Sequence, residues 1–320
     1  RHIYSPNYIS ANLASAPRSD KRVGAALGFS LPHNLLEPPQ VMESDMPATF
    51  RLTLVQANPS VGDLAGNAAL AKQAWAAGKA AVADLVALTE MFITGYQTQD
   101  LILKRAFAEA ALAALAQLAR DCADGPALGI GGPALRDGKL FNAYHILQGG
   151  HIAATILKHD LPNDSVFDEM RLFSAADIHG PIPIGPVRLG IPICEDAWHA
   201  DVCETLAETG AEILLVPNGS PYHRGKPDVR LNLMLNRVVE TGLPLVYLNM
   251  IGGQDDQVFD GASFALNPGG ALACQLPQFE AAVEHLDFAL TDDGWRAVPA
   301  RLALLPDAHE ADYHAMVLSL

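Results

Sequence analysis

The sequence predicts an α/β protein in which a mixed β-sheet is layered with helices. From residue 50 onward, short apolar segments typical of buried strands alternate with Ala-rich or amphipathic segments typical of helices. Glycine-centred turns, such as Gly149-Gly150, join some neighbouring strands directly into hairpins. Half of the 320 residues are hydrophobic, so the chain can bury one large core or two modest ones. Alternation with inserted hairpins indicates a sheet with both parallel and antiparallel strands.

The first half of this region contains two long helices between strands. Residues 50–58 (FRLTLVQAN) form a β-rich segment that ends at Asn-Pro, 67–83 an Ala-rich helix and 105–123 a second helix. Residues 84–90 (DLVALTE) are apolar without alternation, which is typical of a strand buried on both faces. Three strands follow, ALGIGG, LFNAYHILQ and HIAATILKH, and the last two meet at the glycine turn.

The second half continues the alternation of strand and helix. We expect PVRLGIPIC to be a strand that ends at Cys194, with ADVCETLAETG the next helix. AEILLVPN, RLNLMLNRVVETG and LPLVYLN are then strand, helix and strand, and both helices end at glycine, a frequent C-terminal stop. Residues 263–275 (SFALN-PGG-ALACQ) predict a hairpin.

Residues 1–46 differ in composition from the rest of the chain. They are polar, contain several prolines and show no sustained hydrophobic periodicity. Such a segment cannot bury enough apolar surface to fold, so we expect a disordered leader or extension. Met46 is a candidate for the natural start.

Composition excludes several classes of function. The net charge is −15 and no Lys/Arg-rich block occurs, which argues against nucleic acid or an anionic membrane surface as a partner. The four cysteines form no CxxC and no paired His spacing, so we expect no metal site and a reducing compartment. Neither a long apolar run nor a signal peptide is present, which predicts a cytoplasmic location.

The stretch GIPICEDAW places a thiol, Cys194, directly before two carboxylates. Adjacent negative charge raises the pKa of a cysteine, so this thiol needs help to react. Two other ionisable residues end apolar strand segments, Glu90 in DLVALTE and Lys158 in HIAATILK. Buried charges at strand ends are costly unless paired. We therefore expect all three residues to share one site, although a lone buried cysteine is most often a packing residue.

The segments around these residues resemble a known superfamily. LTEMFITGY, LKHDLPNDSVFDEMRLF and GIPICEDAW are similar to the nitrilase (carbon–nitrogen hydrolase) superfamily, whose sites use Glu, Lys and Cys in this order. VFDEMRLF, GSPYHRGK (219–226) and GGQDDQVFDGASF (252–264) further resemble the glutaminase domain of glutamine-dependent NAD synthetases. The resemblance implies a four-layer α-β-β-α sandwich over residues 47–310. Residues 311–320 would start the connection to a synthetase domain that this chain lacks.

The resemblance also implies a mechanism for the shared site. Cys194 would attack the side-chain amide of glutamine, Glu90 would act as general base, and Lys158 with the backbone N–H of Glu195 would stabilise the oxyanion. The products would be glutamate and ammonia, and the ammonia would serve NAD synthesis. The glutaminase step would need no cofactor, whereas ATP and Mg would act only in the synthetase domain. A homo-oligomer is expected on the same ground.

Four further residues carry expectations about support and substrate binding. Glu169 would either hydrogen-bond Lys158, as its counterpart does in the superfamily, or pair with Arg171. By the resemblance, Ser220 and Lys226 match positions that bind glutamine. Asp164 stands where the family usually has a tyrosine that helps to bind glutamine, so a different small amide is an alternative substrate. A catalytically silent scaffold for a synthetase partner is the alternative from another class.

Overall fold

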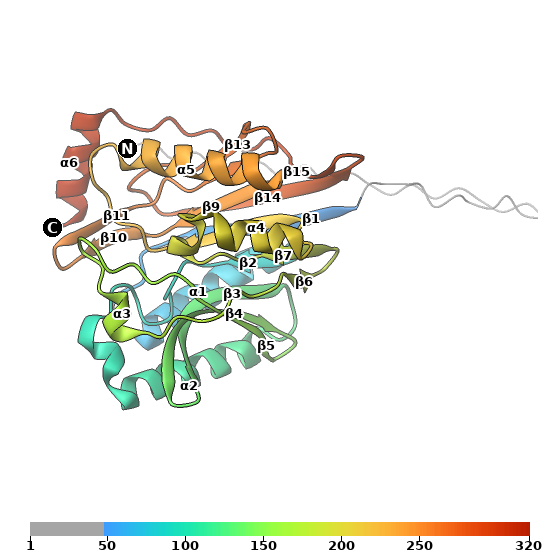
Figure 1. The fold of residues 1–320 in the computed structure, drawn as a ribbon. Coiled ribbons are helices and arrows are strands. Elements are labelled where there is room, and N and C mark those ends of the chain that lie inside the picture. The colour runs from blue at the N-terminus through green and yellow to red at the C-terminus, as the bar shows by residue number, and fades with distance from the viewer. Residues whose placement is uncertain (1–47) are drawn as a thin grey trace, which may run out of the picture. The chain divides into compact units, whose positions relative to one another are not determined.

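The computed structural model describes residues 48–320, so the predicted leader at residues 1–46 lies outside the described residues. Within this part of the chain, two large β-sheets face each other and helices cover their outer sides (Figure 1). Among residues 48–320, none of the helices combines the length and the hydrophobicity that a membrane span requires.

The first sheet has seven strands in the order β15-β14-β1-β2-β3-β4-β5. Strands β1, β2 and β3 are parallel to one another, and the remaining neighbours pair antiparallel. Their bounds are β1 Thr49–Gln56, β2 Leu85–Ala87, β3 Ala127–Arg136, β4 Lys139–Gln148, β5 His151–Leu157, β14 Ala282–Thr291 and β15 Gly294–Ala297. This is the mixed sheet that the alternating sequence pattern predicts.

The second sheet has six strands in the order β13-β12-β9-β8-β7-β6, with β7, β8 and β9 parallel. A separate two-stranded hairpin, β10-β11, lies outside both sheets. The bounds are β6 Ile182–Ile184, β7 Val187–Gly190, β8 Ile213–Asn218, β9 Leu245–Asn249, β10 Ile251–Gln254, β11 Gln257–Asp260, β12 Phe264–Leu266 and β13 Leu272–Gln275.

Four helices form the two outer layers (Figure 1). Helices α1 (Leu64–Ala80) and α2 (Arg105–Asp121) pack on the first sheet, and α4 (Ala200–Glu208) and α5 (Lys226–Thr241) pack on the second. The remaining helical segments are short or terminal: η1 Gln99–Leu103, α3 Glu169–Leu172, η2 Cys194–Ala197 and α6 Ala308–Leu318. The predicted four-layer α-β-β-α sandwich is confirmed.

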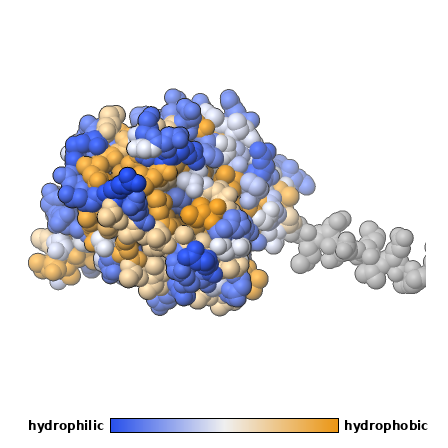
Figure 2. Space-filling model, turned by 90° about the horizontal axis from the view of Figure 1, so that it is seen from below, coloured by the Kyte–Doolittle hydropathy of each residue, from blue (hydrophilic) through white to orange (hydrophobic). Residues whose placement is uncertain are grey.

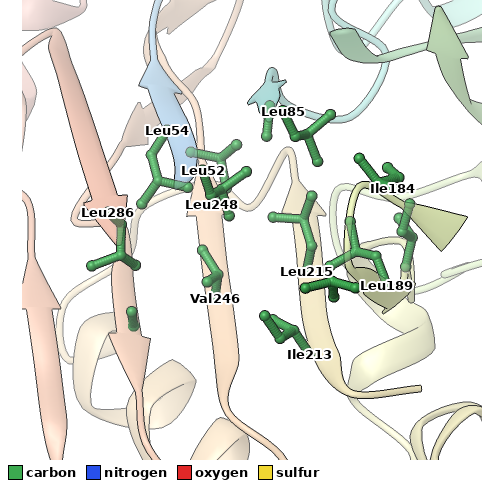
Figure 3. Packing of buried hydrophobic residues seen from close by; sticks show 14 of the residues in the cluster. Leu52, Leu54, Leu85, Ile184, Leu189, Ile213, Leu215, Val246, Leu248 and Leu286 are labelled. Atoms are coloured by element: carbon green, nitrogen blue, oxygen red, sulfur yellow. The ribbon is translucent and has the colours of Figure 1, made fainter. Parts of the chain in front are cut away.

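The main core lies between the two sheets. Figure 3 shows leucine, isoleucine and valine side chains from both sheets pointing toward one another. Those from the first sheet are Leu52, Leu54, Leu85 and Leu286, and those from the second are Ile184, Leu189, Ile213, Leu215, Val246 and Leu248. Both faces of each sheet are covered, and strands β2 and β8 are accordingly almost continuously apolar, whereas β1 alternates apolar residues with Arg51 and Thr53.

The outer face on the α2 side carries apolar and charged residues side by side (Figure 2). Leu64, Ala68 and Leu118 line a groove between α1 and α2. Lys72 of α1 and Asp121 of α2 lie on its rim and form an ion pair with 2.9 Å between Nζ and Oδ2. An exposed pair of this kind adds little to stability, so burial of the alanine-rich inner faces holds these helices in place.

Several boundaries differ from the prediction for local reasons. Helix α1 starts at Leu64, three residues earlier than expected, because the Asp63 side chain caps it by accepting from the Gly66 N–H. The strand expected to run to Cys194 ends at Gly190. Pro192 follows and has no N–H to continue a ladder, so the chain leaves the sheet before the cysteine.

Other elements were not predicted from the sequence. The turn-rich segment GGQDDQVFD is the β10-β11 hairpin, and β14 and β15 form an antiparallel pair at the edge of the first sheet. Helix α6 spans the predicted domain boundary at residue 310. Residues 311–318 of the expected connection are therefore helical, and Ala311 and Ala315 of this segment are buried.

Candidate active site

The three predicted catalytic residues each follow a strand and lie at one edge of the sandwich. Glu90 lies three residues after β2, Lys158 directly follows β5, and Cys194 follows β7 by a short segment and begins η2. The side chains of Glu90 and Lys158 are completely buried, and Cys194 is 3% exposed. The carboxyl ends of strands from two different sheets thus converge on one site.

The Cys194 turn has an unusual backbone. Its φ is +50°, a left-handed conformation that a residue with a Cβ seldom adopts. The η2 turn then leads through Trp198 and His199 into helix α4. A nucleophile on a sharp turn between a strand and a helix is held away from the sheet, where backbone N–H groups can surround a substrate carbonyl.

A buried cluster of ion pairs lies at the centre of the site. Lys158 Nζ donates to Glu90 Oε1 at 2.7 Å and to Glu169 Oε2 at 2.9 Å. The alternative in which Glu169 pairs with Arg171 is wrong. Arg171 instead contacts Asp168 and Asp100 at the surface. One ammonium therefore bridges two carboxylates without access to water.

Three residues of the cluster were not singled out from the sequence. Asn142 Nδ2 donates to Glu90 Oε1 at 2.7 Å, and the Gly219 N–H donates to Glu90 Oε2 at 2.9 Å. The Tyr96 hydroxyl donates to Glu169 Oε1 at 2.9 Å. An asparagine in a strand carries no local signal for this role, whereas Tyr96 ends the LTEMFITGY motif. Gly219 does begin the GSPYHRGK motif, and that position was available to sequence reasoning.

Two glycines allow the backbone to come close to Glu90. A Cβ on Gly131 of β3 would lie 2.1 Å from the Met91 nitrogen, and one on Gly219 would lie 2.4 Å from Tyr96 Cδ1. Both distances are far below van der Waals contact, so a side chain at residue 131 would displace the turn that carries Glu90, and one at residue 219 would displace the Tyr96 ring. The GIGG segment therefore serves the packing of this site.

The cluster keeps Lys158 charged. Burial lowers the pKa of this lysine, but the carboxylates of Glu169 and Glu90 outweigh burial and hold the pKa well above its usual value. Burial also raises the pKa of Glu169, while Lys158 opposes that shift. Burial and the nearby Glu169 carboxylate raise the pKa of Tyr96, so its hydroxyl remains a donor. Lys158 is therefore a permanent cation beside Cys194.

Cys194 is a thiol in the resting site. Burial raises its pKa well above the usual value, and the Glu90 carboxylate raises it further. Lys158 lowers the pKa of the thiol but does not outweigh these effects, and Glu195 adds to them. The neighbouring carboxylate therefore opposes ionisation, as the sequence indicates. Reaction of this sulfur requires transfer of its proton at the moment of attack.

The other three predicted supporting residues, Asp164, Lys226 and Ser220, lie in different surroundings. Asp164 is exposed and lines a surface cleft together with Glu195. Lys226 Nζ lies 4.3 Å from the centroid of the Trp198 ring, a cation–π contact, and burial lowers its pKa. Ser220 is buried, and its Oγ accepts from Arg230 Nε at 3.1 Å.

Within residues 48–320, no three or more His, Cys, Asp or Glu side chains are grouped in a way that could hold a metal ion.

Comparison with known proteins identifies the family. The sequence profile of the carbon-nitrogen hydrolases matches residues 51–293 of this chain. The chain belongs to the carbon-nitrogen hydrolase family. It is 60% identical over 271 residues to a glutamine-dependent NAD(+) synthetase from Rhodobacter capsulatus, covering 85% of this chain and 49% of that protein. A protein of the same name from Acinetobacter baylyi is 31% identical, with 85% and 50% covered. The chain spans about half the length of these curated relatives.

Solved structures agree with this assignment. A glutamine-dependent NAD+ synthetase from Acinetobacter baumannii superposes with a TM-score of 0.78 at 28% identity, covering 85% of this chain and 51% of that chain. An amidase from Nesterenkonia sp. shares the fold, with a TM-score of 0.67 at 24% identity over 75% of this chain and 90% of that chain. This carbon-nitrogen hydrolase therefore has the fold of about half of the synthetase chain and of most of the amidase chain.

Proposed function

We propose that this carbon-nitrogen hydrolase cleaves the side-chain amide of glutamine to glutamate and ammonia, with Cys194 as nucleophile. The observation that carries the proposal is the buried Glu90–Lys158–Glu169 cluster next to a thiol on a left-handed turn. The 60% identity to a relative named for its dependence on glutamine supports this choice of substrate.

In the first half of the reaction, Glu90 removes the proton of the Cys194 thiol as the sulfur attacks the amide carbon. Lys158 and the backbone N–H of Glu195 stabilise the oxyanion that forms, each donor contributing on the order of 3 kcal/mol to the transition state. Glu90 then passes the proton to the departing nitrogen. The C–N bond breaks, ammonia leaves, and a thioester joins the glutamyl group to Cys194.

In the second half, Glu90 removes a proton from water, which attacks the thioester carbon. The same donors stabilise the second oxyanion. The C–S bond breaks, the proton returns to the sulfur, and glutamate leaves. Glu169 supports both halves by holding Lys158, because a second carboxylate partner keeps the ammonium charged and in place.

The mouth of the site suggests how the amino-acid end of glutamine is held. Lys226 is a suitable partner for the α-carboxylate, and Glu195 and Asp164 for the α-ammonium, because charge-assisted contacts are the strongest hydrogen bonds. Ser220 contributes through its hydroxyl hydrogen, because its Oγ already accepts from Arg230, its N–H donates to Asn249 and its carbonyl accepts from Arg230. Asp164 is exposed, so it acts at the rim.

The ammonia would be consumed by a synthetase domain such as the relatives' names imply, in which ATP and Mg would act. The hydrolysis itself would need no cofactor. A cytoplasmic location and assembly into a homo-oligomer remain predictions, and the synthetase domain is the proposed partner.

The proposal is tested by glutamate release, measured for glutamine and for short aliphatic amides. We expect glutamine to be preferred, a thioester or alkylation adduct to form at Cys194, and Cys194→Ala to release no glutamate while remaining folded. A preference for aliphatic amides would replace glutaminase with amidase activity. Full activity of Cys194→Ala would reject the nucleophile, and a folded wild type that forms no adduct would indicate a silent scaffold.

A further inference from the structure

Asp196 is a buried carboxylate that the reaction above does not use. It lies two residues after Cys194 and is 2% exposed. Its oxygens face backbone N–H groups: Oδ1 accepts from His159 at 3.0 Å and from Asp160 at 2.7 Å, and Oδ2 accepts from Ile193 at 2.9 Å. Three main-chain N–H groups therefore donate to the two oxygens of one buried carboxyl group.

The three donors flank two residues of the site. His159 and Asp160 directly follow Lys158, at the end of β5 in the seven-stranded sheet. Ile193 directly precedes Cys194, after β7 of the six-stranded sheet. The Asp196 carboxylate therefore ties the chain that carries the cation to the turn that carries the sulfur, across the boundary between the sheets.

The turn at Cys194 needs hydrogen bonds of this kind to keep its conformation. Cys194 is in the left-handed region, which is unfavourable for a residue with a side chain and persists only where the surroundings hold it. A bond from Asp196 Oδ2 to the preceding N–H and one from the Asp196 N–H to the Ile193 carbonyl at 3.1 Å close the turn on itself. The bonds from the His159 and Asp160 N–H groups to Asp196 Oδ1 then hold this turn against the segment that follows Lys158.

We propose that Asp196 is a positioning residue that sets the distance and direction between the Cys194 sulfur and the Lys158 ammonium. This rests on the proposed role of Cys194 as nucleophile, but it does not depend on glutamine being the substrate. An asparagine at this place has one acceptor oxygen, so it can serve either the Ile193 N–H or the His159–Asp160 pair. Its NH₂ group would face a donor on the other side.

The test is Asp196→Asn, compared with Asp201→Asn on helix α4, which makes the same chemical change at an exposed position. The rate at which iodoacetamide alkylates Cys194, located by mass spectrometry, should fall at least tenfold in Asp196→Asn. kcat for glutamine should fall by a similar factor, with KM within about threefold. Asp201→Asn should match the wild type. If the wild type does not hydrolyse glutamine, the alkylation rates still decide the positioning role.

An Asp196→Asn protein that is folded and alkylates as fast as the wild type would overturn the proposal. So would a loss of reactivity that follows only the unfolded fraction in a thermal unfolding curve. If this variant does not fold, Asp196→Ser, which leaves room for a water, is measured in the same way. Hydrogen exchange of the wild type gives an independent readout. The backbone amides of His159, Asp160 and Ile193 should be strongly protected from exchange. If they exchange at the rate of a free loop, the proposed hydrogen bonds to Asp196 do not hold the turn.

Discussion

Glu90 uses nearly all the acceptor capacity of its carboxylate in the resting structure. Oε1 accepts from Lys158 and Asn142, and Oε2 accepts from Gly219. A carboxylate offers about four acceptor sites, so about one site remains, on Oε2. In the proposed mechanism this remaining site receives the proton of Cys194. Fixing the other sites orients the base before substrate arrives, which avoids reorganisation during the reaction.

The hydrogen bond from the Tyr96 hydroxyl to Glu169 supports the buried Glu90–Lys158–Glu169 cluster, and its contribution can be tested by removing one atom. Tyr96→Phe removes the donor to Glu169 Oε1 and leaves a buried carboxylate oxygen without it. We expect kcat to fall about tenfold, which corresponds to about 1.4 kcal/mol in the barrier. Tyr144→Phe is the matched control, because its hydroxyl donates to the Leu88 carbonyl instead. The control should lose about 1–2 kcal/mol of unfolding free energy, as measured in urea, and keep its activity. Equal activity losses in both variants would contradict the argument.

At the scale of elements, a hydrogen bond from Gly219 to Glu90 connects the segments that follow β8 and β2. Gly219 follows β8 and donates its N–H to Glu90, while its Cα packs against the Tyr96 ring. We expect Gly219→Ala to lower activity at least tenfold and the free energy of unfolding by about 1–3 kcal/mol, because the added methyl forces ring and turn apart. Glutamate release and urea unfolding measure the two effects.

Gly180 provides the control for this substitution. A Cβ there meets nothing within 4 Å, and its backbone is not left-handed. Gly180→Ala should therefore leave activity unchanged and alter stability by less than about 1 kcal/mol. Wild-type activity in Gly219→Ala would show that the close approach to Tyr96 can relax without cost.

Strand β4 contains a buried histidine that links three strands. His145 contacts the Pro133 carbonyl of β3 through Nε2 and Thr155 Oγ1 of β5 through Nδ1, both at 3.0 Å. Burial lowers the pKa of His145 from 6.5 to about 4. The unfolded chain therefore binds this proton more tightly than the folded protein does. The stability that neutral His145 contributes is present above pH 6.5 and is lost as the pH falls toward 4.

We expect this histidine to contribute about 3 kcal/mol to the fall in unfolding free energy between neutral pH and pH about 4. The measurement is urea unfolding of the wild type and of His145→Gln at both pH values. The difference between the proteins isolates this residue, because Asp196, whose pKa burial raises to about 7, acts in the opposite sense in both. Equal pH dependence in the two proteins would contradict the assignment.

For the whole molecule, the layer between the sheets holds the largest cluster of buried apolar side chains within residues 48–320. Leu248 and Leu215 face this layer and are completely buried. We expect Leu248→Ala to lower the free energy of unfolding by about 2–5 kcal/mol, because the lost contacts leave a cavity in a closely packed interior. Leu304 is 96% exposed, so Leu304→Ala should change stability by less than about 0.5 kcal/mol in the same urea experiment. Similar losses of unfolding free energy in the two variants would mean that packing between the sheets does not contribute more to stability than an exposed side chain does.

The residues at the ends of strands could be predicted because their chemistry conflicts with their surroundings. Glu90 and Lys158 each end an apolar segment, and this conflict shows in the linear sequence. Glu169 could be placed only as an alternative between Lys158 and Arg171, since both cations are near it along the chain. Asn142 could not be predicted, because nothing in its local sequence differs from that of an ordinary polar residue. Tyr96 lies in the LTEMFITGY motif, but the motif alone does not show that its hydroxyl reaches Glu169.

By itself, the sequence determined the class of fold and the alternation of strands and helices, and it predicted that Glu90, Lys158 and Cys194 share one site. These follow from hydrophobic patterning and from charges in apolar segments, which are local properties. Only the tertiary structure decided how two sheets meet at one edge, which donors hold Glu90, and that Asp196 faces main-chain N–H groups instead of the thiol. Those contacts join residues far apart in the chain, and their energies depend on burial and distance, which arise only when the layers pack.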